Sequence, residues 1–153
     1  MTAVPGHPSL GCLQPVSDGS RTLFTSRVHL ASAANPVLSG ADAVVGVEIE
    51  CTGLTGPRLS SHLAESWRRA TAALDDLPRI RRLVAAGAPA AFWVAEGTDA
   101  PVDIFDRLRV AGLAVDLAGT VTLSFLIGPD VASQLVVVRD DAGSVSAPVL
   151  TRG

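Results

Sequence analysis

Hydrophobic and polar residues alternate in two segments of the first third of the chain, which predicts two β-strands there. Over residues 21–30 the inward side is formed by Phe24, Ser26, Val28 and Leu30. Over residues 42–51 the inward side is formed by Val45, Val47, Ile49 and Cys51. The two strands can pair as a hairpin, and a register that keeps both inward sides together places Thr25 opposite Glu48.

The next segment changes to a helical period. Apolar residues recur there at spacings of three and four, at Leu59, Leu63, Trp67, Ala70, Leu74 and Leu77. This stripe predicts an amphipathic helix that begins near Pro57, because proline is tolerated in a first helical turn. Pro78 interrupts the pattern and opens a second, shorter helix that ends at Gly87.

The second half of the chain predicts one more helix and a run of strands. Residues 90–96 indicate a buried strand, and a helix is expected from Thr98 or Asp99 to Gly112. Three or four strands are then expected, over residues 113–117, 120–128 and 134–140, with 145–150 as the optional fourth, separated by Gly/Pro/Asp turns. The order β-β-α-α-β-α-β-β-β is typical of the α+β class. We therefore expect a single domain with a largely antiparallel sheet and its helices on one face.

The first 20 residues contain several prolines and glycines before any periodic pattern begins. We expect an irregular leader over residues 1–20 and one α+β domain over residues 21–153. The start of the chain lacks a basic segment followed by an apolar block, so no signal peptide is expected. With no apolar run long enough to cross a membrane, the sequence predicts a cytoplasmic protein without a membrane partner.

Composition excludes several classes of chemistry. The 153 residues include twelve basic residues, all of them arginine, and no tyrosine. Without lysine or tyrosine, Schiff-base chemistry, a phosphate-loop lysine and a tyrosine acid are all excluded. The net charge of −3 argues against nucleic acid as a partner, because phosphate neutralisation needs a basic excess. Richness in Ala, Gly and Arg indicates a GC-rich bacterial genome.

Two carboxylates, Glu48 and Glu50, lie on the outward side of the second strand, where Arg27 and His29 face them from the first. One hypothesis treats these four residues as a catalytic group for metal-independent acid–base work such as isomerisation, dehydration or cyclisation. The other treats them as a solvated strand face with an Arg–Glu pair. Coverage of the face decides between them, since burial is what shifts carboxylate pKa values.

The two middle helices carry a cluster of arginines: Arg68, Arg69, Arg79, Arg81 and Arg82. They avoid the apolar stripe and are therefore expected to face water. Arginine forks suit carboxylates and phosphates, so the cluster could dock an acidic protein or a phosphorylated carrier. The alternative is an ordinary solvated helix surface.

No motif for a cofactor or a metal is present. His62 and Glu65 share a helix face but supply only two ligands, and no H-x-x-x-H or C-x-x-C spacing occurs. We expect no metal and no cofactor. Cys51 is interpreted as a small core residue rather than a nucleophile.

The strand VGVEIE, residues 45–50, resembles the VG-V-D-I-E strand of phosphopantetheinyl transferases, and ESWRRATAAL, residues 65–74, echoes that family's W-x-x-K-E-A motif. The resemblance covers about a tenth of the chain. The aspartate that holds magnesium in that family is a glutamate here, and the lysine–glutamate pair is absent. We therefore do not assign the chain to it.

Two functions remain open from the sequence. The favoured one is a non-catalytic accessory or assembly module of a bacterial cytoplasmic system, which acts by self-association as a homo-oligomer or by docking an acidic partner. The alternative is a small acid–base enzyme or small-molecule binder that uses the polar strand face.

Overall fold

The computed structural model describes residues 13–29, 44–87, 108–127 and 133–152. Within them, seven strands form one sheet in which every strand lies beside its neighbours in sequence. The strands are β1 (Gln14–Asp18), β2 (Arg21–His29), β3 (Val44–Glu50), β4 (Leu108–Val115), β5 (Val121–Ile127), β6 (Ser133–Arg139) and β7 (Val149–Arg152). All neighbouring pairs are antiparallel except β3 and β4, which are parallel. The predicted α+β class and largely antiparallel sheet are confirmed.

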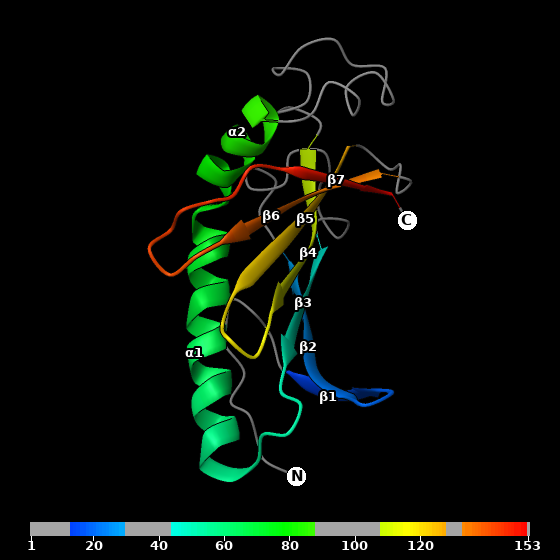
Figure 1. Ribbon diagram of the computed structural model, residues 1–153, viewed down its shortest axis with the longest axis vertical. Helices are drawn as coiled ribbons and strands as arrows, with labels where there is room; N and C mark the ends of the chain where they lie inside the picture. The colour runs from blue at the N-terminus through cyan, green and yellow to red at the C-terminus, as the bar shows by residue number, and fades with distance from the viewer. Residues whose placement is uncertain (1–12, 30–43, 88–107, 128–132, 153) are drawn as a thin grey trace.

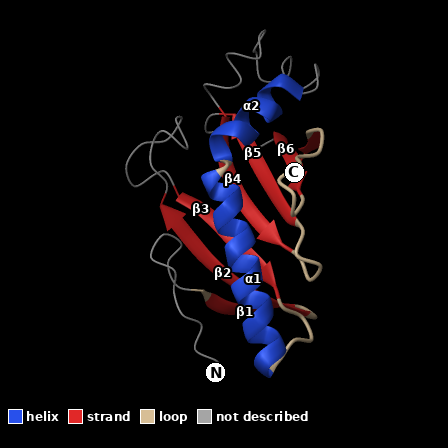
Figure 2. Ribbon diagram, turned by 90° about the vertical axis from the view of Figure 1, so that its left-hand side faces the viewer, coloured by secondary structure: helices blue, strands red, loops and turns tan. Residues whose placement is uncertain are grey.

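Two helices, α1 (Gly56–Asp75) and α2 (Leu77–Gly87), lie on one face of this sheet (Figures 1 and 2). Pro57 occupies the first turn of α1, as predicted. The predicted stripe faces the sheet, with Leu63, Ala70, Leu74 and Leu77 buried and Leu59 and Trp67 half-buried against the core. Neither helix covers the opposite side of the sheet, which we call the distal face.

The core lies between the helices and the near face of the sheet. Val45, Val47 and Ile49 of β3 have no exposed surface, and Phe125 of β5 is also completely buried. Phe24, Ser26 and Val28 of β2 point to the same side and are buried too. The alternation in the sequence therefore assigned the described inward residues of both strands correctly, because the period of a strand is two, while Leu30 lies outside the described residues.

The β2–β3 hairpin has the predicted register. Thr25 pairs with Glu48, while Arg27 pairs with Gly46 and Leu23 with Glu50. A shift by one residue would have exposed the buried valines of β3, which is why the pattern specifies this alignment.

Two local predictions are wrong. Gln14–Asp18 were expected to be irregular, yet they form β1 and pair with β2. Leu108 to Gly112 were expected to end a helix, yet they belong to β4. The residues of this segment alternate in burial on either side of a register shift between Val110 and Gly112. That shift breaks the strict period of two and produces spacings that resemble a helix. The predicted strand at 90–96 and most of the predicted helix after it lie outside the described residues.

Two hairpin turns of the sheet share one sequence pattern, Asp-Xaa-Xaa-Gly-Thr/Ser. In the first, from Asp116 to Thr120 between β4 and β5, the Asp116 carboxylate accepts a hydrogen bond of 2.8 Å from the Thr120 N–H. Asp140 and Ser144 make the equivalent bond of 2.9 Å in the turn after β6. The glycines of the two turns, Gly119 and Gly143, have φ values of 85° and 86°. We call these the twin turns.

Replacing Gly119 with alanine is expected to lower the free energy of unfolding by about 1–2 kcal/mol, because an L-residue is strained at this positive φ. A Cβ at Gly119 would also lie 2.5 Å from Nη1 of Arg69. Urea unfolding of the two proteins measures the difference. The control is Ala118→Ser, at an exposed position of the same turn. Equal stability of the Gly119 variant and the wild type would contradict the assigned turn.

Candidate functional site

The four residues of the predicted polar site belong to β2 and β3, and Arg27, Glu48 and Glu50 lie on the distal face. Arg27 and Glu48 are exposed. Glu50 is half-buried and forms an ion pair with Arg21, in which Nε of Arg21 lies 3.3 Å from Oε1 of Glu50. His29 ends β2, opposite Val44 in the register, and its side chain is outside the described set. The strand face does form an Arg–Glu pair, but the arginine is Arg21 rather than Arg27.

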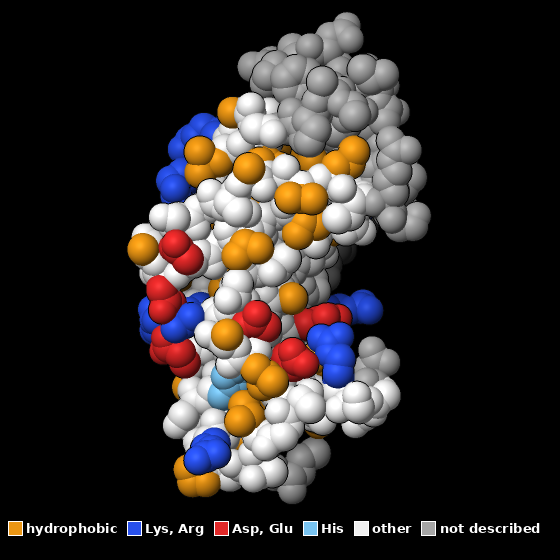
Figure 3. Space-filling model, in the orientation of Figure 1, with side chains coloured by type: hydrophobic (Ala, Val, Ile, Leu, Met, Phe, Trp, Pro, Cys, Tyr) orange, Lys and Arg blue, Asp and Glu red, His pale blue; other side chains and the backbone are white. Residues whose placement is uncertain are grey.

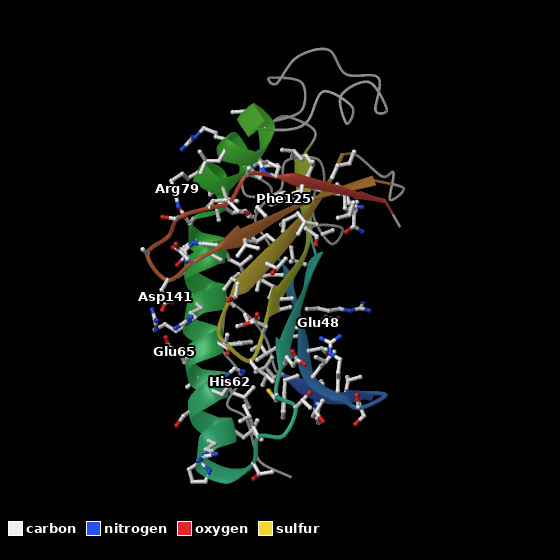
Figure 4. The ribbon with its side chains drawn as sticks, viewed as in Figure 1. Glu48, His62, Glu65, Arg79, Phe125 and Asp141 are labelled. Carbon is white, nitrogen blue, oxygen red and sulfur yellow. The ribbon has the colours of Figure 1, made fainter. Side chains whose placement is uncertain are left out.

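Arg27 and Glu48 are neighbours on the sheet surface, one strand and one pleat apart. Among the described residues, neither side chain belongs to an ion pair. Figure 4 shows Glu48 on the side of the sheet away from α1. These two opposite charges are therefore presented outward together.

The strand registers align the side chains of the distal face in rows that cross the sheet. One row runs from β2 to β7 through Arg27, Gly46, Gly112, Ser124, Val136 and Val149. The next row runs from β1 to β6 through Gln14, Thr25, Glu48, Ala114, Thr122 and Val138. We call them the Arg27 row and the Glu48 row. None of their residues is buried.

Both rows have the same gradient of side-chain chemistry. Charged groups lie at the β2–β3 end, small residues in the middle, and valines at the β6–β7 end. Val138 and Val149 are 38% and 60% exposed, which is high for valine in a strand. Figure 3 shows, in one view, acidic and basic side chains gathered at mid-height with hydrophobic ones above them.

Two shallow hollows lie beside Glu48. One of about 210 Å³ is floored by the small residues of the rows, from Gly46 across to Ser124. The other, of about 70 Å³, lies between Glu48, Glu50 and Asp116. Both are smaller than the roughly 300 Å³ at which small-molecule sites usually begin.

The five arginines predicted as a docking surface have different environments. Arg81 is buried, with 2% of its surface exposed, which corrects the expectation that the cluster faces water. Arg69 of α1 donates hydrogen bonds of 2.8 Å to the Gly119 carbonyl and 2.7 Å to the Asp141 carboxylate. Its side chain is 21% exposed.

Arg79 of α2 has the same role at the other twin turn. It donates to the Gly143 carbonyl and forms an ion pair with Asp76, which also accepts from Arg139 of β6. Figure 4 shows Arg79 and Asp141 on the helix side of the molecule. Arg69 and Arg79 thus connect the helix layer to the twin turns. Of the five arginines in the predicted cluster, Arg68 and Arg82 are the exposed ones that do not make these contacts. Arg68 is paired with Glu65.

His62 and Glu65 do not form a metal site. His62 Nε2 lies 2.7 Å from the Glu50 carbonyl, which can only accept, so this nitrogen donates. Glu65 instead accepts from Arg68 and Arg69, and these hydrogen bonds lower its pKa from 4.5 to about 2. Among the described residues, no group of three or more potential ligands could hold a metal ion.

A further hollow of about 610 Å³ lies at the start of α1, next to His62. Its described lining contains one charged side chain, that of Arg58, together with Thr52, Leu54, Pro57, Ser61, His62 and Leu117. The sequence prediction did not place these residues together, because Leu117 is remote from the others in the chain and follows a different strand.

Cys51 is a core residue, as predicted, with 1% of its surface exposed. Its thiol lies 3.6 Å from the Ile49 carbonyl. Burial first, and then the charge of the neighbouring Glu50 carboxylate, raise the pKa of this thiol to about 11. A thiol with such a pKa is protonated at neutral pH and is a poor nucleophile.

Comparison of the chain with models of protein families, with curated proteins and with solved structures found no match in any of the three. No helix in the described segments has the length and apolar character needed to cross a membrane.

Proposed function

We propose that the protein is a non-catalytic assembly module that acts by self-association through the distal face of its sheet. The observation that carries the proposal is the composition of this face, where exposed valines, small residues and two opposite charges outside any ion pair of the described residues lie together on a side that neither helix covers. Exposed apolar residues rimmed by polar ones are typical of interaction surfaces.

A bacterial cytoplasmic accessory role fits this proposal. The face holds both signs of charge in one patch, which suits contact with another copy better than contact with a strongly acidic or basic partner.

Docking of an acidic protein or carrier by the arginine cluster is less well supported. Arg69 and Arg79 already bind carboxylates and carbonyls of the same chain, and Arg81 is buried. A partner would have to break these contacts before it could use the guanidinium groups. The acid–base enzyme is the second alternative, and the two hollows beside Glu48 are small for a substrate.

Sedimentation velocity of the full chain across micromolar concentrations tests the proposal. We expect a concentration-dependent dimer whose dissociation constant rises at least tenfold in the variant Val138→Asp, because a charge would be buried without a partner. Arg82→Glu, on the exposed surface of α2, is the control and should leave the dimer unchanged.

A wild-type protein that remains monomeric would overturn the proposal. Native mass spectrometry of protein purified from its own host adds a second readout. A retained small molecule that is lost in Glu48→Gln would favour the enzyme or binder alternative instead.

A further inference from the structure

Gly46 and Gly112 are adjacent on β3 and β4, in the middle of the Arg27 row. Neither residue is among the glycines with a positive φ. A Cβ at Gly46 would meet nothing within 4 Å, and one at Gly112 would meet only the Gly46 carbonyl, at 3.7 Å. Contacts among the described residues therefore do not require glycine at Gly46, whereas Gly112 borders the register shift in β4. Glycine inside a strand often marks a bulge or a place where a ligand or another backbone approaches closely, and no register shift borders Gly46.

The charges of the distal face point to the chemistry of that other chain. Arg27 and Glu48 lie side by side, exposed and outside any ion pair among the described residues. A surface with a positive charge in one row and a negative charge in the next is complementary to a second copy of itself that is related by a two-fold rotation. This is the requirement for an isologous contact between identical chains.

Sheet geometry restricts how two distal faces can meet. A two-fold axis that relates stacked sheets lies between them, either along the strands or across them. An axis along β4 would place β3 over the partner's β5, and so the charged end of each face over the valine end of the other. An axis across the strands places each strand over its own copy, so charged ends meet charged ends and valines meet valines.

We propose that two copies of the chain stack distal face on distal face, about a two-fold axis that crosses the strands between the two rows. The Arg27 row of each copy then lies over the Glu48 row of the other. This inference rests on the proposed function and adds the register of the contact.

The two rows complement each other position by position in this register. The Glu48 side chain of one copy enters the space over Gly46 of the other, beside the hollow of about 210 Å³. Arg27 lies over Thr25 of the other copy, with Glu48 on the adjacent strand about 4.8 Å away, which forms two ion pairs across the dimer. Gly112 meets Ala114, Ser124 meets Thr122, and Val136 meets Val138. The valine end supplies the apolar contact.

Charge reversal tests the register. Each of the single variants Arg27→Glu and Glu48→Arg is expected to raise the dimer dissociation constant at least 30-fold, or about 2 kcal/mol, because like charges then face each other. The double variant Arg27→Glu/Glu48→Arg restores both cross-pairs and should recover affinity to within about tenfold of the wild type. Arg82→Glu is the matched control, and sedimentation velocity is the measurement.

Gly46→Val tests the close approach separately. The variant monomer should fold normally, since the fold leaves room for the side chain and valine favours strands, while the dimer is lost. Far-UV circular dichroism and urea unfolding below the dimer dissociation constant report the fold of the monomer.

The outcomes separate the two proposals. A wild-type dimer that tolerates Gly46→Val, or whose charge-reversed double variant stays as weak as the single ones, overturns this register and leaves self-association standing. A wild-type protein that stays monomeric, or that copurifies with a different molecule bound to the distal face, overturns both the register and the self-association.

Discussion

Phe125→Ala is expected to lower the free energy of unfolding by about 3–5 kcal/mol, a large part of the roughly 5–15 kcal/mol available to a domain of this size. Phe125 is completely buried, and its backbone pairs with Val110 of β4 and Leu135 of β6. Removal of the ring leaves a cavity in the middle of the near face, which neighbouring strands cannot close without shifting the sheet. Urea unfolding followed by circular dichroism measures the loss.

Leu83→Ala is the control for this experiment. Leu83 lies on α2 and is 43% exposed, so its truncation should change stability by less than about 0.5 kcal/mol. A similarly small effect at Phe125 would contradict the placement of the core between the helices and β5.

Asp76→Asn is expected to lower the free energy of unfolding by about 1–2 kcal/mol, because the Asp76 side chain connects three elements of the fold. Its carboxylate lies at the junction of α1 and α2 and accepts from Arg79 of α2 and Arg139 of β6. Arg139 is only 14% exposed and would lose its charged partner. Solvent limits the effect to this range, because Asp76 is itself 22% exposed and water screens the pair. Asp75→Asn, at an exposed neighbouring position, is the control.

The same carboxylate predicts a pH dependence. Hydrogen bonds from Arg79 first, and then the charges of Arg79 and Arg139, hold the pKa of Asp76 below its ordinary value of 3.8. The stabilisation is therefore present above that value and is lost as the pH falls through the lower pKa of the folded state. Stability of the wild type should fall more steeply between about pH 4 and pH 2 than that of Asp76→Asn. Parallel slopes for the two proteins would show that Asp76 does not contribute.

The parts of the fold that could be predicted are those governed by a local period. The pairing of Thr25 with Glu48 follows from alternation, since only that register buries Val45, Val47 and Ile49 together. The stripe from Leu59 to Leu77 specified both the helix and its buried side. β1 was missed because Pro15 was taken as a sign of irregular chain, although Asp18-Gly19 is a hairpin signal that could have revealed it.

The parts that could not be predicted depend on contacts between distant residues. Arg69 reaches Asp141 and Arg79 reaches Gly143 across the fold, and nothing in the local pattern distinguishes these arginines from solvated ones. The arginine cluster was therefore read as a docking surface when much of it binds the chain's own turns. The rows of the distal face depend on the β3–β4 register, which joins two halves of the sequence and has no local signature.

The single parallel pair in the sheet also has a consequence for how the chain folds. β1–β3 and β4–β7 are two antiparallel groups, each built from contacts close in sequence, and they meet only where Gly46 to Ile49 of β3 pair with Gly112 to Val115 of β4. Each group can form early, whereas the junction must first close the long intervening loop. Formation of this junction is therefore expected to limit the rate at which the whole sheet folds.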